Sequence, residues 1–401
     1  MKNRNGKQKQ IRCAFFFHDT DYYSGGTRSL LDIIDTYMKH KNVQVIAVVP
    51  SDKGSAVEYL KLHNIKIIYS HYYQIRYDLD ESRSKFLFKL IERMLRLVIS
   101  KMWVMLKTVP ELKENNVNVI YSNTSFILAG YWCSKSLNIP IVSHFREFGE
   151  EDHRIGIWFG RKKFYDIVNQ YDKIICISDA LKNKYQKFID GEKISVIYDD
   201  VSEKYLNWND KQFSLNENFD RKFNILIAGN LIPGKGQLKV LHQIVKLLKE
   251  YNQIMVYLAG NPSDEKYVKE IIDFIEESEI SEQVKLLGLV ENMNELRKEM
   301  HMGIVFSDME AFGRVTIEGM LSGMLMVASD VGGSVELIED GVNGFLAKKD
   351  GSNLEDIVHN IYVNYEKLED VRKNGYKFAQ KFTQGNCAKQ LLKEIATLVR
   401  D

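Results

Sequence analysis

Short apolar runs alternate with amphipathic segments along most of the chain, and this alternation predicts its fold class. The first apolar run, 13–17, precedes an amphipathic segment at 28–40, and further runs follow at 43–50 and 65–69. Short apolar runs are typical of buried strands, whereas a 3.6-residue spacing is typical of helices. Strands and helices in strict turn predict an α/β protein with parallel sheets covered by helices on both faces.

The same alternation continues toward the C-terminus. Further strands are expected at 117–122, 139–143, 173–178, 194–198, 223–228, 255–259, 284–287, 303–306 and 325–330. Further helices are expected at 56–63, 126–137, 179–188, 237–250, 315–323, 354–365, 376–382 and 388–400. The stretch 201–222 is rich in Asn, Asp, Lys and Ser without apolar periodicity, which predicts a linker. A chain of 401 residues suits about two domains, which we place at 1–205 and 206–385.

One long segment, 83–107, has a different pattern. Its basic residues share one narrow stripe of the expected helix and leave a wide apolar face: Lys85, Lys89, Arg93, Arg96 and Lys107. A membrane-spanning helix needs about 20 nearly uncharged residues, and Lys101 interrupts the longest apolar run. Two interpretations remain: a core helix with extended basic side chains, or a helix on an anionic membrane surface with its apolar side in lipid.

Composition narrows the class of protein. The 55 basic and 54 acidic residues leave a net charge of +1, so there is no general electrostatic basis for binding nucleic acid. The four cysteines lie far apart without metal-ligand spacing, which predicts reduced thiols and no metal site. The apolar run 13–17 is too short for the core of a signal peptide.

The stretch 303–350 carries the most chemistry. The strand expected at 303–306 leads into a polar turn with Glu310, and a helix containing Glu318 follows. A helix N-terminus just after a parallel strand offers unpaired amides and about half a positive charge, which suits the phosphates of a nucleotide. After the next strand, Gly332 and Gly333 allow close approach of another backbone segment.

The runs EAFGRVTIE, SGMLMVASDVGG and ELIEDGVNGFL resemble the signature of glycosyltransferase family 4. The resemblance implies a retaining enzyme with the GT-B fold, in which two doubly wound Rossmann-like domains face a central cleft. It implies that Glu310 contacts the donor sugar near the reacting centre and that Glu318 accepts a hydrogen bond from the ribose. On the basis of the resemblance, the four residues that follow Glu310 are assigned to binding of the donor: Ala311, Phe312, Gly313 and Arg314.

The loop after the strand at 223–228 matches the family's donor-phosphate loop. It places Lys235 just before a helix, where a cation meets a phosphate. Many family members have an arginine where this chain has Asn230, and Leu289 lies where the family contacts the nucleotide base. We expect a nucleotide-sugar substrate, a UDP-sugar first, and no cofactor or metal, because Lys235 and the helix N-terminus can stabilise the charge on the leaving diphosphate.

The first domain carries weaker candidates. Taken alone, Gly25 and Gly26 fit either a plain turn or a phosphate or sugar site, and the family places this loop in the cleft, so they are assigned to the donor. His144 follows an expected strand, where ligands bind in open α/β sheets, and the family has a histidine there that touches the donor sugar, so it is a catalytic candidate. The run HFREFGEED resembles enzymes that build bacterial capsular and wall polysaccharides. Its charged residues fit either acceptor contacts or salt bridges: Arg146, Glu147 and Asp152.

The resemblance therefore predicts a retaining glycosyltransferase that moves a sugar to a glycan or lipid-linked acceptor in bacterial surface polysaccharide synthesis. It also implies that the last helix, within 386–401, returns to the first domain. The expected place is the cytoplasm or the inner face of the cell membrane. Asn230 in the arginine position leaves a catalytically silent GT-B subunit that binds a partner or a glycan as an alternative. A nucleotide-sugar epimerase on the same fold would need its own acid and base pair.

Overall fold

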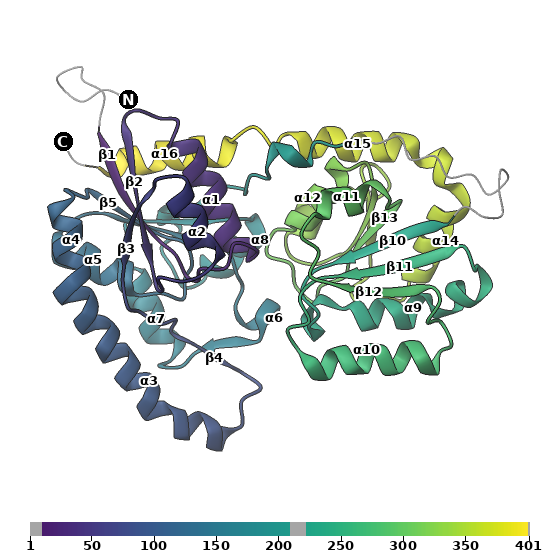
Figure 1. Ribbon diagram of the computed structural model, residues 1–401, viewed down its shortest axis with the longest axis horizontal. Coiled ribbons are helices and arrows are strands. Elements are labelled where there is room, and N and C mark those ends of the chain that lie inside the picture. Colours follow the sequence, from purple (N-terminus) through teal and green to yellow (C-terminus); the bar gives the residue numbers. More distant parts are fainter. Residues whose placement is uncertain (1–9, 209–221, 400–401) are drawn as a thin grey trace. The chain divides into compact units, whose positions relative to one another are not determined.

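The computed structural model describes residues 10–208 and 222–399, which form two compact units (Figure 1). Unit 1 combines Met1–Asp200 with Gly385–Asp401, and unit 2 is Val201–Gln384. These transitions lie beside the expected domain boundaries at 205/206 and 385/386. Within the expected linker, 209–221 lies outside the described residues.

Unit 1 is built on a seven-stranded parallel sheet in the order β3-β2-β1-β5-β6-β8-β9. Its strands are β1 (Ile11–Phe16), β2 (Val43–Val49), β3 (Lys66–Tyr69), β5 (Val119–Ser122), β6 (Ile141–Phe145), β8 (Lys173–Cys176) and β9 (Ile194–Val196). The chain first extends the sheet from β1 to β3 and then adds strands on the other side of β1, so the direction changes between β1 and β5. A small antiparallel pair, β4 (Arg76–Asp78) with β7 (Ile155–Ile157), was not predicted from the sequence.

Helices surround this sheet, and the last one comes from the C-terminal segment. They are α1 (Gly25–Tyr37), α2 (Ser55–Leu62), α3 (Arg83–Trp103), the π-helical turn η1 (Val104–Thr108), α4 (Val109–Glu114), α5 (Ala129–Leu137), α6 (Glu150–His153), α7 (Arg161–Val168), α8 (Asp179–Tyr185), η2 (Gly191–Lys193) and α16 (Asn386–Leu398). Helix α16 buries Leu391 and Ile395 in the core of unit 1, and the Tyr37 hydroxyl donates to the Ala388 carbonyl at 3.0 Å. The C-terminal helix is therefore an integral part of unit 1.

Unit 2 has a six-stranded parallel sheet in the order β12-β11-β10-β13-β14-β15. Its strands are β10 (Phe223–Ala228), β11 (Ile254–Ala259), β12 (Val284–Gly288), β13 (Met302–Val305), β14 (Leu325–Ser329) and β15 (Phe345–Ala347). Its helices and helical turns are η3 (Glu203–Tyr205), η4 (Pro233–Lys235), α9 (Gln237–Glu250), α10 (Glu265–Glu277), α11 (Met293–Lys298), α12 (Arg314–Leu321), α13 (Ser334–Leu337), α14 (Leu354–Asn364), η5 (Tyr365–Leu368) and α15 (Glu369–Gln380).

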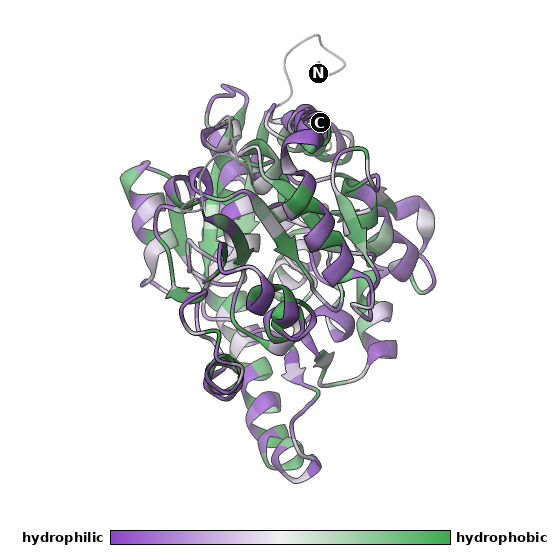
Figure 2. Cartoon of the chain, turned by 90° about the vertical axis from the view of Figure 1, so that its right-hand side faces the viewer, coloured by the Kyte–Doolittle hydropathy of each residue, from purple (hydrophilic) through white to green (hydrophobic). Residues whose placement is uncertain are grey.

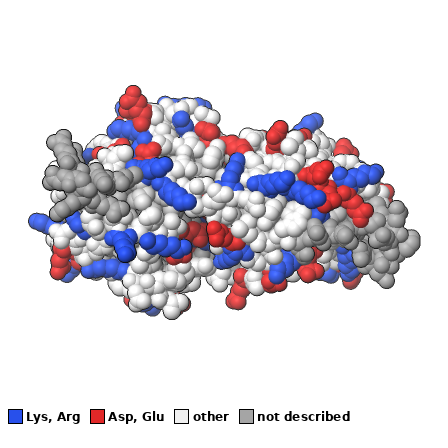
Figure 3. Space-filling view, turned by 90° about the horizontal axis from the view of Figure 1, so that it is seen from above, with Lys and Arg blue, Asp and Glu red and all other residues white. Residues whose placement is uncertain are grey.

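The strands of both sheets are mostly apolar, as the green colour in Figure 2 shows, and the central strands β1, β10 and β14 are almost fully buried. In unit 2, Ile225, Val256 and Val327 on neighbouring strands belong to one core cluster, and burying each such side chain contributes roughly 1.5–3 kcal/mol. Both units therefore confirm the predicted α/β class with parallel sheets. On the face shown in Figure 3, positive and negative side chains are interspersed, in keeping with the near-equal numbers of each.

Helix α3, drawn in blue in Figure 1, departs from the pattern of the other helices. Its apolar side chains face solvent: Phe88 is 86% exposed, and Ile91 is 69% exposed. Two cations of the basic stripe turn inward instead, since Lys89 and Arg93 contact the buried Glu81 carboxylate at 3.2 and 2.5 Å, whereas the other three are exposed. The interpretation as a core helix is therefore wrong. No helix in the described ranges is both long and apolar enough to cross a bilayer.

Candidate functional site

Two loops of unit 2 meet where the sheet changes direction. Strand β10 lies between β11 and β13, so the chain builds outward through β12 and then returns to the other side of β10. Ligands of open α/β sheets bind at this switch point, beyond the carboxyl ends of the strands. The loop after β10 carries Asn230 and Lys235, and the loop after β13 carries Ser307 and Glu310. The structure thus brings Lys235 and Glu310 into contact, and their roles toward a donor stay predictions.

Glu310 is held by two neighbours. Lys235 Nζ lies 3.2 Å from its Oε2 atom, and the Ser307 hydroxyl donates to the same oxygen at 2.9 Å. The side chains of Lys235 and Glu310 are 29% and 14% exposed. Since both contacts use Oε2, Oε1 is the oxygen that can accept a ligand hydroxyl. Ser307 was not singled out from the sequence, because a serine in a polar turn carries no distinctive signal.

Glycines make the close packing of these loops possible. Gly236 has a φ of +70°, and a Cβ there would come within 2.2 Å of the Phe306 carbonyl oxygen. At Gly332 a Cβ would come within 2.1 Å of the Glu310 carbonyl oxygen, which also accepts the Gly333 N–H at 2.6 Å. The expected close approach of backbone at Gly332 and Gly333 is confirmed, and it fixes the loop that carries Glu310.

Helix α12 begins at Arg314, directly after Gly313, whose φ of +106° favours glycine. Its N-terminal end, which carries a partial positive charge, follows the Glu310 loop through Ala311 and the buried Phe312. An anion bound near Lys235 would therefore meet both a cation and a helix N-terminus.

Glu318 lies further along α12 and is mostly buried, where it forms an ion pair with Arg297 of α11. The Arg297 guanidinium also lies over the Tyr205 ring, 5.2 Å from its centroid. Sequence reasoning missed Arg297, because it belongs to a different helix and no local motif marks it. Leu289 follows the edge strand β12 and is 53% exposed, and Asn230 is also exposed.

The second group of candidates lies in unit 1. The expected strand ended at 143, which would place His144 after it. In the structure His144 lies within β6 and is fully buried. The Tyr121 hydroxyl contacts its Nδ1 atom, and Arg146 Nη2 donates to Nδ1 at 3.0 Å. Since arginine only donates, Nδ1 is the acceptor and Nε2 carries the proton. Burial lowers the pKa of His144, and the nearby Arg146 charge lowers it further. Nε2 is buried and has no hydrogen-bond partner among the described residues.

Arg146 is the centre of a buried polar cluster. Its guanidinium donates to Asn123 Oδ1 and Ser29 Oγ, both at 2.9 Å, and to the Asp199 carboxylate at 2.5 and 2.6 Å. Burial lowers the pKa of Arg146, but the nearby negative charge of Asp199 outweighs this effect and raises the pKa above its usual range. Because these partners enclose the side chain, Arg146 positions its neighbours, including His144.

The other two acceptor candidates also bond within unit 1. Glu147 Oε1 accepts hydrogen bonds from the Ser125 N–H and hydroxyl at 3.2 and 3.1 Å. Asp152 accepts from the Phe148 and Gly149 backbone N–H groups at 2.8 and 2.7 Å, at the N-terminus of α6. These contacts favour local structural roles for both carboxylates, and an acceptor role stays a prediction.

Gly25 and Gly26 lie in the first turn of α1, because this helix begins at Gly25 and not at 28 as predicted. A Cβ at Gly26 would come within 3.0 Å of His18 Cε1, and the Gly26 carbonyl accepts from Asn123 Nδ2 at 2.8 Å. The helix N-terminus thus meets the loops after β1 and β5, at the switch point of unit 1. No local motif marks His18 or Asn123 beyond their places after strands.

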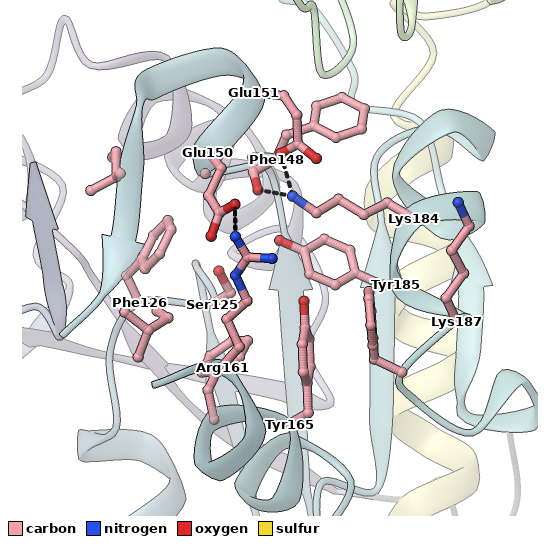
Figure 4. A pocket seen from close by; sticks show the side chains of 15 residues that line it. Ser125, Phe126, Phe148, Glu150, Glu151, Arg161, Tyr165, Lys184, Tyr185 and Lys187 are labelled. Carbon is pink, nitrogen blue, oxygen red and sulfur yellow. Dashed lines mark hydrogen bonds and ion pairs between the residues drawn. The ribbon is translucent and has the colours of Figure 1, made fainter. Parts of the chain in front are cut away.

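A cavity of about 260 Å³ lies in unit 1 beside α6, α7 and α8 (Figure 4). Arg161 forms an ion pair with Glu150 at its rim, and Lys184 forms one with Glu151. Its aromatic lining comprises Phe126, Phe148, Phe164, Tyr165, Tyr185 and Phe188. Apolar and aromatic walls with a few polar groups are typical of sites for small molecules. Sequence reasoning did not predict this cavity.

Two protein families match adjacent parts of the chain. The family described as Glycosyltransferase Family 4 matches residues 23–201, and Glycosyl transferases group 1 matches residues 209–378. An uncharacterized glycosyltransferase of Methanocaldococcus jannaschii is 29% identical over 232 residues, which are 57% of this chain and 60% of the relative. The N-acetyl-alpha-D-glucosaminyl L-malate synthase of Bacillus anthracis is 24% identical over 184 residues, 45% of this chain and 47% of that protein. The chain thus spans about half of the length of such curated relatives.

Solved structures match nearly the whole chain. HepE of Anabaena, solved in complex with UDP and glucose, has a TM-score of 0.74 and 20% identity over 97% of this chain and 100% of its own. A glycosyltransferase of Rickettsia africae has a TM-score of 0.76 and 16% identity over 98% and 100% of the two chains. At these identities the likeness concerns the fold, and it confirms the expected GT-B fold class.

Proposed function

We propose that the chain is a retaining glycosyltransferase of family 4 that uses a nucleotide-sugar donor, and the family matches over 23–201 and 209–378 support this proposal. The observation that carries this proposal is the contact between Lys235 and Glu310 at the switch point of unit 2, beside the N-terminus of α12. A cation, a helix N-terminus and a carboxylate in one place suit a ligand with both a diphosphate and sugar hydroxyls.

The chemical need is to stabilise the diphosphate as its bond to the anomeric carbon breaks. Lys235 and the α12 N-terminus supply positive charge to the leaving group, so no metal is required. Glu310 accepts hydrogen bonds from the donor sugar through Oε1, and Glu318, held by Arg297, accepts one from the ribose. In unit 1, His144 stays a catalytic candidate from the family resemblance, with a buried Nε2–H group that has no hydrogen-bond partner among the described residues.

For the donor, we propose a UDP-sugar. Support comes from the solved relative HepE, which was crystallised with UDP-glucose in one structure and with UDP and glucose in another. A thermal-shift screen of UDP-, GDP-, ADP- and dTDP-sugars tests this choice, and the UDP-sugar should raise the Tm most. The shift should persist in EDTA if no metal is needed, and it should shrink in Lys235→Ala.

For the acceptor, we propose a glycan or a lipid-linked glycan of bacterial surface polysaccharide synthesis. The aromatic cavity of unit 1 supports a sugar, because aromatic faces pack against sugar rings and the paired charges at its rim can bond hydroxyls. Tyr165→Ala, which removes an aromatic wall and spares the ion pairs, should raise the KM for the acceptor and leave the donor KM unchanged.

The exposed apolar face of α3 supports a peripheral position on the inner face of the cell membrane. Apolar side chains such as Phe88, Ile91 and Leu95 cover this face, and the exposed cations Arg83 and Lys101 flank it. A helix with this pattern lies in the membrane interface, where anionic head groups attract the cations.

Asn230 favours the second candidate, a catalytically silent subunit, since it replaces an arginine with a neutral amide in the donor-phosphate loop. The two candidates differ in a single-turnover assay with the donor. Release of the free sugar or its transfer supports the enzyme, and tight donor binding without either supports the silent subunit.

A further inference from the structure

A second cavity of unit 1, of about 220 Å³, lies between α3 and the strand pair of β4 and β7. Arg76 of β4 and three cations of α3, Lys89, Arg93 and Arg96, line it together with Tyr73 and Trp158. Sites for whole drug-sized ligands measure roughly 300–1,000 Å³, so this space suits one small polar group. Three guanidinium groups that line one cavity, from β4 and α3, favour phosphate, whose oxygens match the planar fork of arginine.

The cations of the cavity outnumber the acids beside them. Lys89 and Arg93 share one carboxylate, Glu81, and Arg96 lies 2.5 Å from Glu92. Arg76 is exposed and forms no ion pair with a described residue. Four positive groups therefore face two negative ones, which leaves a local excess of positive charge for an anion.

Helix α3 lines this cavity with one face and presents an apolar face suited to lipid on the other side. Lys89 and Arg93 face the unit, whereas Ile91, Leu95 and Val98 cover the outward face of α3. An interfacial helix buries its apolar face about 5–10 Å into the boundary between head groups and acyl chains, and a helix with its side chains is about 10–12 Å across. Its opposite face then lies at the level of the lipid head groups. The cavity would open to phosphates when the outward face is in lipid.

We infer that the cavity lined by Arg76, Arg93 and Arg96 binds the phosphate of a lipid head group while the outward face of α3 lies in the membrane. This inference rests on the peripheral membrane position in the proposed function. It adds a specific phosphate site to what would otherwise be a general attraction of cations to an anionic surface.

The test compares vesicles of equal surface charge, made anionic either by phosphatidic acid, whose phosphate is exposed, or by phosphatidylserine. The full chain should bind the phosphatidic acid vesicles more tightly. Arg76→Gln with Arg96→Gln should weaken that binding about 30-fold, since each cation near the surface contributes about 1 kcal/mol, and should remove the preference. Lys266→Gln with Lys269→Gln is the matched control, because it removes the same charge from exposed positions on α10.

Several results would overturn the inference. The first is equal binding of the full chain to the two kinds of vesicle, and the second is an equal loss of vesicle binding in the control variant. The third is inorganic phosphate that binds the lipid-free protein as tightly as vesicles do, because the occupant would then be a free anion. If the double variant does not fold, Arg76→Gln alone serves, with about half the effect in free energy. Sugar transfer by the natural chain is measured separately. If no sugar is transferred but the preference for phosphatidic acid vesicles is present, only the proposed function is contradicted. If sugar is transferred but that lipid preference is absent, only this inference is contradicted.

Discussion

The switch points of the two sheets hold polar clusters of opposite character. In unit 1, Arg146 and Asp199 are buried and bond to one another and to their neighbours. In unit 2, Lys235 and Glu310 are partly exposed, and their contact is longer, at 3.2 Å. A buried, enclosed ion pair fixes the fold around it, whereas a partly exposed pair can exchange its partners for those of a ligand.

This difference indicates that the unit 1 cluster positions its neighbours and that the unit 2 pair binds a ligand. Although Arg146 was predicted to contact an acceptor, its partners already enclose it, and its contact with His144 defines which nitrogen of that ring carries the proton. Changes in the unit 1 cluster should therefore appear in folding, and changes in the unit 2 pair should appear in turnover and donor affinity.

The largest effect is expected from Asp199→Ala. It leaves the Arg146 charge buried without its carboxylate partner, which should lower the free energy of unfolding by roughly 3–5 kcal/mol. Urea denaturation followed by circular dichroism measures it. Asp52→Ala, which removes an exposed carboxylate of unit 1, should change stability little. An unchanged urea midpoint in Asp199→Ala would contradict the structural role of this pair.

Glu310→Ala should leave the fold intact and lower turnover about 10²–10³-fold, because it removes a hydrogen-bond acceptor for the sugar in the transition state. Steady-state kinetics with the best donor measures this loss. Asp308→Ala is the control in the same loop, since its side chain is exposed and its charge is the same. Similar losses in both variants would remove Glu310 from its assigned role.

Lys235→Ala should weaken binding of a nucleoside diphosphate by roughly 1.5–3 kcal/mol, the range for a charge-assisted hydrogen bond. Isothermal calorimetry with UDP measures the change, and the exposed Lys246 on the following helix provides the control, Lys246→Ala. Equal affinities of Lys235→Ala and the natural chain would mean that the diphosphate binds elsewhere.

The smallest effect concerns Asp200, next to Asp199. Burial raises the pKa of Asp200 to about 7, although its carboxylate accepts the Cys387 N–H at 2.7 Å. Because the folded pKa lies above the unfolded one, folding binds a proton between the two values, and stability from this group falls as pH rises toward 7.

We therefore expect the natural chain to lose up to about 2 kcal/mol of unfolding free energy between about pH 5.5 and pH 8 relative to Asp200→Asn, which cannot ionise. Urea midpoints of both proteins at the two pH values give this difference. Parallel pH profiles would show that the Asp200 carboxyl does not titrate in this range.

Much of this molecule could be predicted from local patterns. The strand at 223–228 and the helix at 237–250 match β10 and α9 at both ends, because their apolar spacing is regular and the glycines between them mark the turn. The positions of Lys235 and Glu310 in loops after parallel strands also followed from this pattern, whereas the contact between the two side chains was not predicted. The pair of β4 and β7 was missed, since three-residue strands give too short a pattern to recognise.

The sequence by itself determined the alternation of strands and helices, the glycines at close backbone contacts and the residues at the strand ends, since each depends on neighbours a few positions apart. Only the tertiary structure decided the partners of Arg146 and Glu318, which lie 53 and 21 residues away in the chain. It also decided the direction of α3. Periodicity defines the width of an apolar face, but whether that face is covered depends on what packs beside it. Here Glu81 holds Lys89 and Arg93 on the inward side, and the apolar side is exposed to solvent.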